Sequence, residues 1–116
     1  YGFSCGGVFA LYTMLTQPGL FRRYIASSCT WPDASSFLLA HEQQYAEQPK
    51  HPPVNLYLSV GGLEDSLHGF WALTEVLRKR NYLGLNLRTQ IYDGERHGSG
   101  IISHSFPYGL RSIYQP

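Results

Sequence analysis

The chain has 116 residues with a formal net charge of +1, and 43% of its residues are hydrophobic, 15% aromatic and 15% charged. This composition is typical of a folded globular domain and excludes a disordered chain. Because acids and bases are interspersed and nearly balanced, neither nucleic acid nor an anionic membrane surface is an expected partner. No apolar run approaches the roughly 20 residues that span a bilayer.

A length of 116 residues is short for an α/β fold with helices on both faces of its sheet, which usually needs about 150 residues or more. Residues 1–6 are typical of the turn that follows a buried strand. We therefore expect residues 1–116 to form one partial domain, the C-terminal part of a larger fold without its N-terminal half.

The two cysteines, Cys5 and Cys29, are too few to build a disulfide scaffold. No spacing of histidines or cysteines matches a zinc site. We therefore predict no metal site, and the cysteine usage weakly favours a reducing, cytoplasmic compartment. A single disulfide bond between Cys5 and Cys29 is the alternative, because both residues follow predicted strands.

The first half of the chain alternates helix and strand signals. Apolar residues recur with helical spacing up to Pro18 and predict a helix of about ten residues. Residues 24–28 are short, apolar and partly β-branched, as in a buried parallel strand. Residues 35–47 are expected to form the next helix, with Ser35 or Ser36 as its cap.

The second half continues the same alternation. Residues 54–60 are the clearest strand, and residues 67–81 predict a helix whose basic last turn complements its dipole. Residues 85–92 predict another strand. A final helix over residues 100–113 is weakened by Pro107.

Alternating strands and helices of these lengths predict an α/β fold, with a mostly parallel sheet and helices on both faces. Phe37 is expected to be a packing residue of the helix over residues 35–47, and Trp71 lies in the helix over residues 67–81. In such sheets ligands bind beyond the carboxyl ends of the strands. Trp31 follows a strand at that edge and is a candidate wall of a substrate pocket, although a core or surface tryptophan is the alternative.

A candidate nucleophile stands near the start of the chain. Gly2-Phe3-Ser4-Cys5-Gly6 matches G-x-S-x-G, the turn that lifts a serine hydroxyl above a sheet, and an apolar helix follows it as that motif requires. Glycines flank the motif because side chains there would meet the serine backbone. The backbone N–H of Cys5 is then placed to donate into an oxyanion hole. The alternatives are a plain Gly-Ser turn, and Cys5 as nucleophile, which puts the glycines at the wrong offsets.

A serine hydroxyl needs a base to take its proton. His97 lies in the polar loop after the strand over residues 85–92 and is the predicted base. A surface histidine is the alternative reading of this residue, and His104 in the last helix is the reserve candidate for the base.

The order serine, acid, histidine restricts the acid to the segment before the histidine loop. Glu64 and Asp65 directly follow the strand over residues 54–60, whereas Asp93 and Glu95 stand too close to the histidine in sequence. We choose Glu64 as the acid that orients the imidazole. The alternative is that Glu64 and Asp65 only cap the following helix.

These motifs resemble the esterase family of α/β-hydrolases that includes siderophore (enterobactin-type) esterases, esterase D-like S-formylglutathione hydrolases and mycolyltransferases. The likeness is carried by the elbow, the second strand with its aromatic loop, the acid turn and the histidine loop, which are residues 2–7, residues 24–28 with Trp31, residues 60–64 and residues 94–99. The siderophore-esterase branch is the most similar, because its acid turn often reads Val-Gly-x-x-Glu, which supports Glu64.

The resemblance implies a serine hydrolase that cleaves a small-molecule carboxylic ester through an acyl-enzyme, without a cofactor. Ser4 would attack the ester, and His97 would act first as base and then as acid. The family places a second oxyanion donor N-terminal to the elbow, and the chain departs from the family there. A non-catalytic α/β-hydrolase-like domain and an acyltransferase with the same residues are the alternatives.

Overall fold

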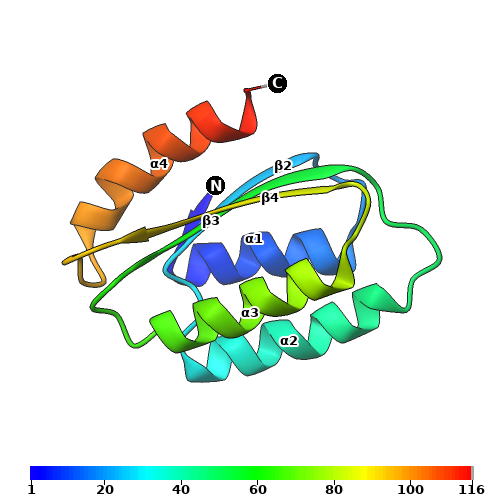
Figure 1. Ribbon diagram of the computed structural model, residues 1–116, viewed down its shortest axis with the longest axis horizontal. Helices are drawn as coiled ribbons and strands as arrows, with labels where there is room; N and C mark the ends of the chain where they lie inside the picture. Colours follow the sequence, from blue (N-terminus) through cyan, green and yellow to red (C-terminus); the bar gives the residue numbers. More distant parts are fainter. Residues whose placement is uncertain (116) are drawn as a thin grey trace.

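The computed structural model describes residues 1–115. Strands and helices alternate along this range (Figure 1). Their bounds are β1 (Gly2–Phe3), α1 (Cys5–Thr16), β2 (Arg23–Ser27), α2 (Pro32–Ala46), β3 (Val54–Gly61), α3 (Leu67–Arg80), β4 (Leu85–Tyr92) and α4 (Ser99–Ile113). None of these described helices is both long and apolar enough to cross a membrane.

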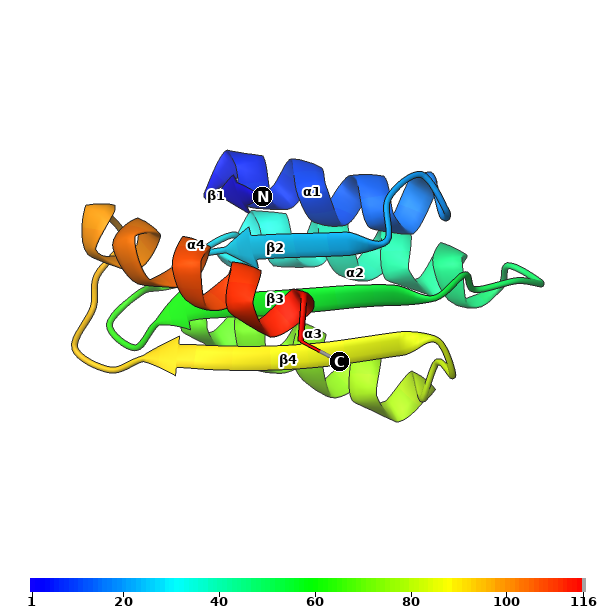
Figure 2. The same cartoon turned by 90° about the horizontal axis from the view of Figure 1, so that it is seen from above.

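The four strands form one sheet in the order β1-β2-β3-β4, and every neighbouring pair is parallel. Helices α1, α2 and α3 cover one face of this sheet, and α4 lies across the other (Figures 1 and 2). The prediction of an α/β fold with a parallel sheet and helices on both faces is confirmed. All carboxyl ends of the strands therefore meet at one edge of the sheet.

The core lies mainly between the sheet and the three helices on its first face. Alternate residues of the central strands, including Ala26, Leu56, Leu58 and Val60, are buried in one cluster with residues of α1, α2 and α3. The intervening residues Ile25 and Tyr57 face α4 and pack with Ile113. This alternation follows from the two-residue period of a strand, and burial on both faces explains why β2 and β3 are nearly continuous apolar runs.

The start of α2 differs from the prediction. The helix begins at Pro32, three residues before the expected caps Ser35 and Ser36, and Trp31 is its cap. The Ser35 N–H donates to the Trp31 carbonyl over 2.7 Å, so Ser35 already belongs to the first helical turn. Proline is favoured at this position, because its fixed φ suits a helix and the first turn lacks acceptors for its N–H groups.

Phe37, which was expected to pack, is on the surface, and so is Trp71. Phe37 is 44% exposed and Trp71 is 53% exposed. Their neighbours Leu38 and Phe70 are buried instead. Consecutive helical residues point about 100° apart, so only one of each adjacent pair faces the sheet. The final helix expected over residues 100–113 is confirmed as α4, which continues through Pro107 to Ile113.

Helix α1 approaches β2 closely at Gly7. A Cβ at this position would stand 2.8 Å from Cys29 Cβ and 3.0 Å from the Ser27 carbonyl oxygen. Gly6, one position earlier in the same helix, has open space around the place of its Cβ. A side chain would therefore be crowded at Gly7 and would have room at Gly6.

We expect Gly7→Ala and Gly6→Ala to change stability in opposite directions. Alanine is favoured over glycine in a helix by about 0.5–1 kcal/mol, which should stabilise the Gly6→Ala protein by up to that amount. At Gly7 overpacking costs about 1–3 kcal/mol and outweighs this gain. Urea unfolding of both variants checks the prediction, and equal stability changes would contradict it.

Candidate active site

Four polar side chains meet at the carboxyl edge of the sheet. Ser4 follows β1, Ser28 follows β2, Glu64 follows β3 and His97 follows β4. Because the strands are parallel and adjacent, their following loops lie side by side. The topology thus gathers residues that are up to 93 positions apart in the sequence.

Ser4 occupies a strained turn between β1 and α1. Its φ of 59° and ψ of −121° lie outside the regions that most residues adopt, and its N–H donates to the Ser27 carbonyl over 2.8 Å. A Cβ on Gly2 would collide with the Gly6 carbonyl oxygen, so Gly2 must lack a side chain. A Cβ on Gly6 would meet no atom outside its own helix within 4 Å, so crowding there by the serine backbone stays a prediction.

His97 lies between the other two residues of the predicted set. Its Nε2 is 3.0 Å from Ser4 Oγ, and its Nδ1 is 2.6 Å from Glu64 Oε1. The Phe3 ring stacks on the imidazole, with centroids 4.9 Å apart and planes 29° apart. A neutral imidazole with its proton on Nδ1 donates to Glu64 and offers Nε2 as acceptor for the Ser4 hydroxyl.

The Glu64 side chain is fully buried and hydrogen-bonded at both oxygens. Oε2 accepts the Ser28 hydroxyl over 2.6 Å and the Gly61 N–H over 2.7 Å, while Oε1 faces His97. These contacts compensate for the loss of water around the carboxylate. By contrast, Asp65 is exposed.

The other candidates from the sequence lie outside this arrangement. Asp93 is exposed, and so is His104, which lies on α4 and stacks on Tyr92. The Glu95 carbonyl accepts the Leu63 N–H over 3.1 Å, which fastens the histidine loop to the acid turn. Glu95 thus contributes its backbone to the site, and its position explains why the two loops stay together.

The first turn of α1 can supply an oxyanion donor. The Gly7 and Val8 N–H groups donate to the Ser4 carbonyl. The Cys5 N–H precedes them, and amides at the start of a helix have no acceptor within that helix. The helix dipole adds positive potential there. The role of Cys5 as an oxyanion donor stays a prediction.

Trp31 is half-buried at the start of α2 and packs against the main core cluster. Its predicted role in a substrate pocket stays a prediction.

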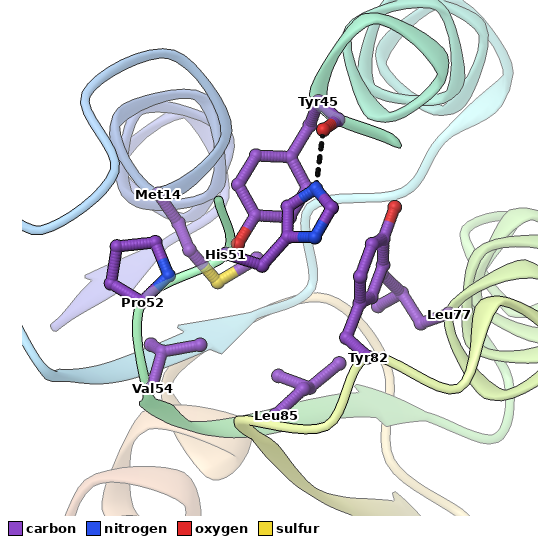
Figure 3. A pocket seen from close by; sticks show the side chains of 8 residues that line it. All are labelled: Met14, Tyr45, His51, Pro52, Val54, Leu77, Tyr82 and Leu85. Carbon is purple, nitrogen blue, oxygen red and sulfur yellow. Dashed lines mark hydrogen bonds between the residues drawn. The ribbon is translucent and has the colours of Figure 1, made fainter. Parts of the chain in front are cut away.

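An enclosed cavity lies at the opposite edge of the sheet, where β3 and β4 begin (Figure 3), and its volume of about 10 Å³ has room for about one water molecule. It is lined by Met14, Tyr45, His51, Pro52, Val54, Leu77, Tyr82 and Leu85. An ester substrate cannot occupy it.

Neither cysteine forms a disulfide bond: Cys5 is an exposed thiol and Cys29 a buried one. Burial, and then the charge of Glu64, raise the pKa of the Cys29 thiol to about 12. Among residues 1–115, no group of three or more His, Cys, Asp or Glu side chains is placed to hold a metal ion.

Sequence reasoning missed two contributors to this site, Ser28 and Phe3. Ser28 was treated as the end of a strand, and Phe3 as a free position of the elbow motif. The polar run after residues 24–26 was the available signal, because small polar residues at the end of a buried strand lie at the ligand edge. Nothing local to Phe3 indicates its partner, which is 94 positions away.

The family described as phospholipase/carboxylesterase matches residues 1–99 of this chain. Over 66 residues the chain is 35% identical to ferri-bacillibactin esterase BesA of Bacillus subtilis (strain 168), an alignment that covers 55% of this chain and 23% of that protein. The predicted resemblance to siderophore esterases is confirmed.

Solved structures of related proteins share the fold of this chain. The BES protein from Bacillus cereus superposes with a TM-score of 0.81 at 30% identity, over 99% of this chain and 45% of that one. The siderophore hydrolase EstB from Aspergillus nidulans gives a TM-score of 0.72 at 25% identity, over 100% of this chain and 49% of that one. This chain therefore spans less than half the length of these relatives.

We expect a thiol reagent such as Ellman's reagent to modify only Cys5 in the folded protein at pH 8. With a pKa of about 12, the Cys29 thiol is about four pH units from half-ionisation, so almost no reactive thiolate forms. Absorbance should report one thiol per folded chain and two after unfolding. Two rapidly reacting thiols in the folded protein would contradict the burial of Cys29.

Proposed function

The chain belongs to the phospholipase/carboxylesterase family, and from this premise we propose that it carries the catalytic residues of a serine hydrolase that cleaves a carboxylic ester. The observation that carries the proposal is the unbroken line of hydrogen bonds from Ser4 Oγ through the His97 imidazole to Glu64. A hydroxyl, a base and an acid in this order form the arrangement that activates a serine.

In the proposed first step, Ser4 Oγ attacks the ester carbonyl carbon while His97 Nε2 takes the hydroxyl proton. The carbonyl oxygen becomes an oxyanion, and the Cys5 N–H donates to it. Collapse of this intermediate breaks the bond to the alcohol oxygen, and His97 returns the proton to the departing alcohol. The product of this half-reaction is an ester of Ser4.

In the second step, His97 takes a proton from water, and the resulting hydroxyl oxygen attacks the acyl carbon. The bond to Ser4 Oγ breaks, the proton returns to Ser4, and the carboxylic acid leaves. Both steps place a transient positive charge on the imidazole. Glu64 Oε1 stabilises that charge over 2.6 Å and keeps the remaining ring proton on Nδ1.

The proposed substrate is an ester bond within a siderophore. Support comes from the relative named ferri-bacillibactin esterase, which shares 35% identity over the aligned 66 residues. Siderophore hydrolases also occur among the relatives with the same fold.

We expect a fluorophosphonate probe to label the folded protein at Ser4. The probe phosphonylates serines that a neighbouring base activates, and the Ser4 hydroxyl lies 3.0 Å from His97 Nε2. Peptide mass spectrometry locates the adduct, with Ser4→Ala and heat-unfolded protein as controls. Absence of the adduct from Ser4 in folded wild-type protein would refute the proposed nucleophile.

We expect Glu64→Gln to lower kcat by at least about a hundredfold, and Asp65→Asn to change it by less than about twofold. Glutamine has nearly the shape of glutamate but cannot stabilise the imidazolium, whereas the Asp65 side chain is exposed to solvent. Steady-state hydrolysis of an aryl ester measures both variants. A larger loss in Asp65→Asn would make Asp65 the acid.

A further inference from the structure

The loop after β2 brings a buried hydroxyl to the Glu64 carboxylate. Ser28 is completely buried, and its Oγ lies 2.6 Å from Glu64 Oε2. Because an ionised carboxylate only accepts hydrogen bonds, the Ser28 hydroxyl is the donor. Ser28 lies 36 positions from Glu64 in the sequence and follows a different strand.

We propose that Ser28 is a positioning residue that fixes the rotation of the Glu64 carboxylate, so that Oε1 faces His97. This inference rests on the proposed function, because it assigns Ser28 a part in the same reaction. Ser28 itself does not touch the substrate; it acts through Glu64.

The three donors are divided unequally between the two carboxylate oxygens. The Ser28 hydroxyl and the Gly61 N–H both bind Oε2, and only the His97 ring N–H binds Oε1. Turning the carboxylate would break both bonds at Oε2. The two donors differ in origin, because Gly61 belongs to the same turn as Glu64 and moves with it. Of these two donors, only Ser28 ties the carboxylate to another segment, the loop after β2.

The backbone of Ser28 adopts a conformation that serine rarely takes. Its φ of 54° lies in the left-handed region, which disfavours residues with a side chain. Its N–H still donates to the Ser59 carbonyl over 2.9 Å, so the residue stays attached to β3 while the chain turns away. Such conformations persist where the surrounding structure holds them and often serve a functional site.

The same loop offers a matched control at Thr30. The Thr30 hydroxyl is buried and donates over 2.8 Å to the Ser66 backbone carbonyl. This bond also joins the loop after β2 to the acid turn, but it ends on a backbone carbonyl rather than on the carboxylate. Removing it therefore loosens the same two loops without taking a donor from Glu64.

The test compares Ser28→Ala, Ser28→Gly and Thr30→Val in the purified protein. The alanine variant removes the hydroxyl, and the glycine variant removes it while accommodating the left-handed backbone. The measurements are kcat and KM for an aryl ester, and the downfield proton resonance of His97 Nδ1–H, assigned by its loss in His97→Asn. Thermal unfolding identifies any variant that fails to fold.

We expect kcat to fall between about tenfold and a hundredfold in both Ser28 variants, with KM nearly unchanged, because a misplaced catalytic group slows the chemical step. The His97 resonance should broaden or disappear in both. Thr30→Val should keep the resonance and a kcat within about twofold of wild type, even where its unfolding temperature falls. Ser28→Gly should unfold at or above the temperature of Ser28→Ala.

Wild-type kcat and an unchanged His97 resonance in both Ser28 variants would overturn the proposal. An equal fall in kcat in Thr30→Val would also overturn the proposal, because general loosening of the loops would then explain the lower kcat of the Ser28 variants. The resonance separates this inference from the proposed function. If wild-type protein hydrolyses no ester but the resonance is lost only in the Ser28 variants, the proposed function fails and the positioning role stands.

Discussion

The hydrogen bond between His97 Nδ1 and the buried Glu64 carboxylate is the interaction on which the site depends. It joins the loop after β4 to the turn after β3 over 2.6 Å. A buried carboxylate is costly unless it is fully hydrogen-bonded, and here Ser28 and Gly61 supply the other two donors. This bond fixes the imidazole, and the fixed imidazole leaves its second nitrogen facing Ser4.

The parallel sheet makes this contact possible. Its four strands lie in sequence order, so successive loops stand next to each other at one edge. Each loop then contributes one polar group, and the backbone bond from Leu63 to the Glu95 carbonyl keeps the last two loops together. The apolar core residues hold the strands in register. They thereby also set the spacing of the polar side chains that follow the strands.

Much of this arrangement follows from local patterns in the sequence. The strand over residues 85–92 has the predicted bounds, and the elbow around Ser4 has the strained turn that its motif indicates. These features depend on short-range periodicity and on glycine at required positions. The topology then places Ser4, Glu64 and His97 at one edge, as expected for an α/β fold.

The remaining features depend on contacts that local patterns do not encode. The left-handed backbone of Ser28 and the stacking of Phe3 on His97 both require partners from distant segments. The exposure of Trp71 depends on which side of its helix meets the sheet, and adjacent apolar residues leave that choice open. Sequence reasoning therefore identifies the proposed reacting groups better than the groups that hold them.

The most direct test of the proposed function is whether Glu64 acts only through His97. The measurement is kcat/KM for an aryl ester in His97→Ala and in the double variant His97→Ala/Glu64→Gln. Residues that act as one unit have strongly non-additive effects, so we expect equal kcat/KM in the two proteins within about twofold. A further loss in the double variant as large as that of Glu64→Gln alone would contradict it.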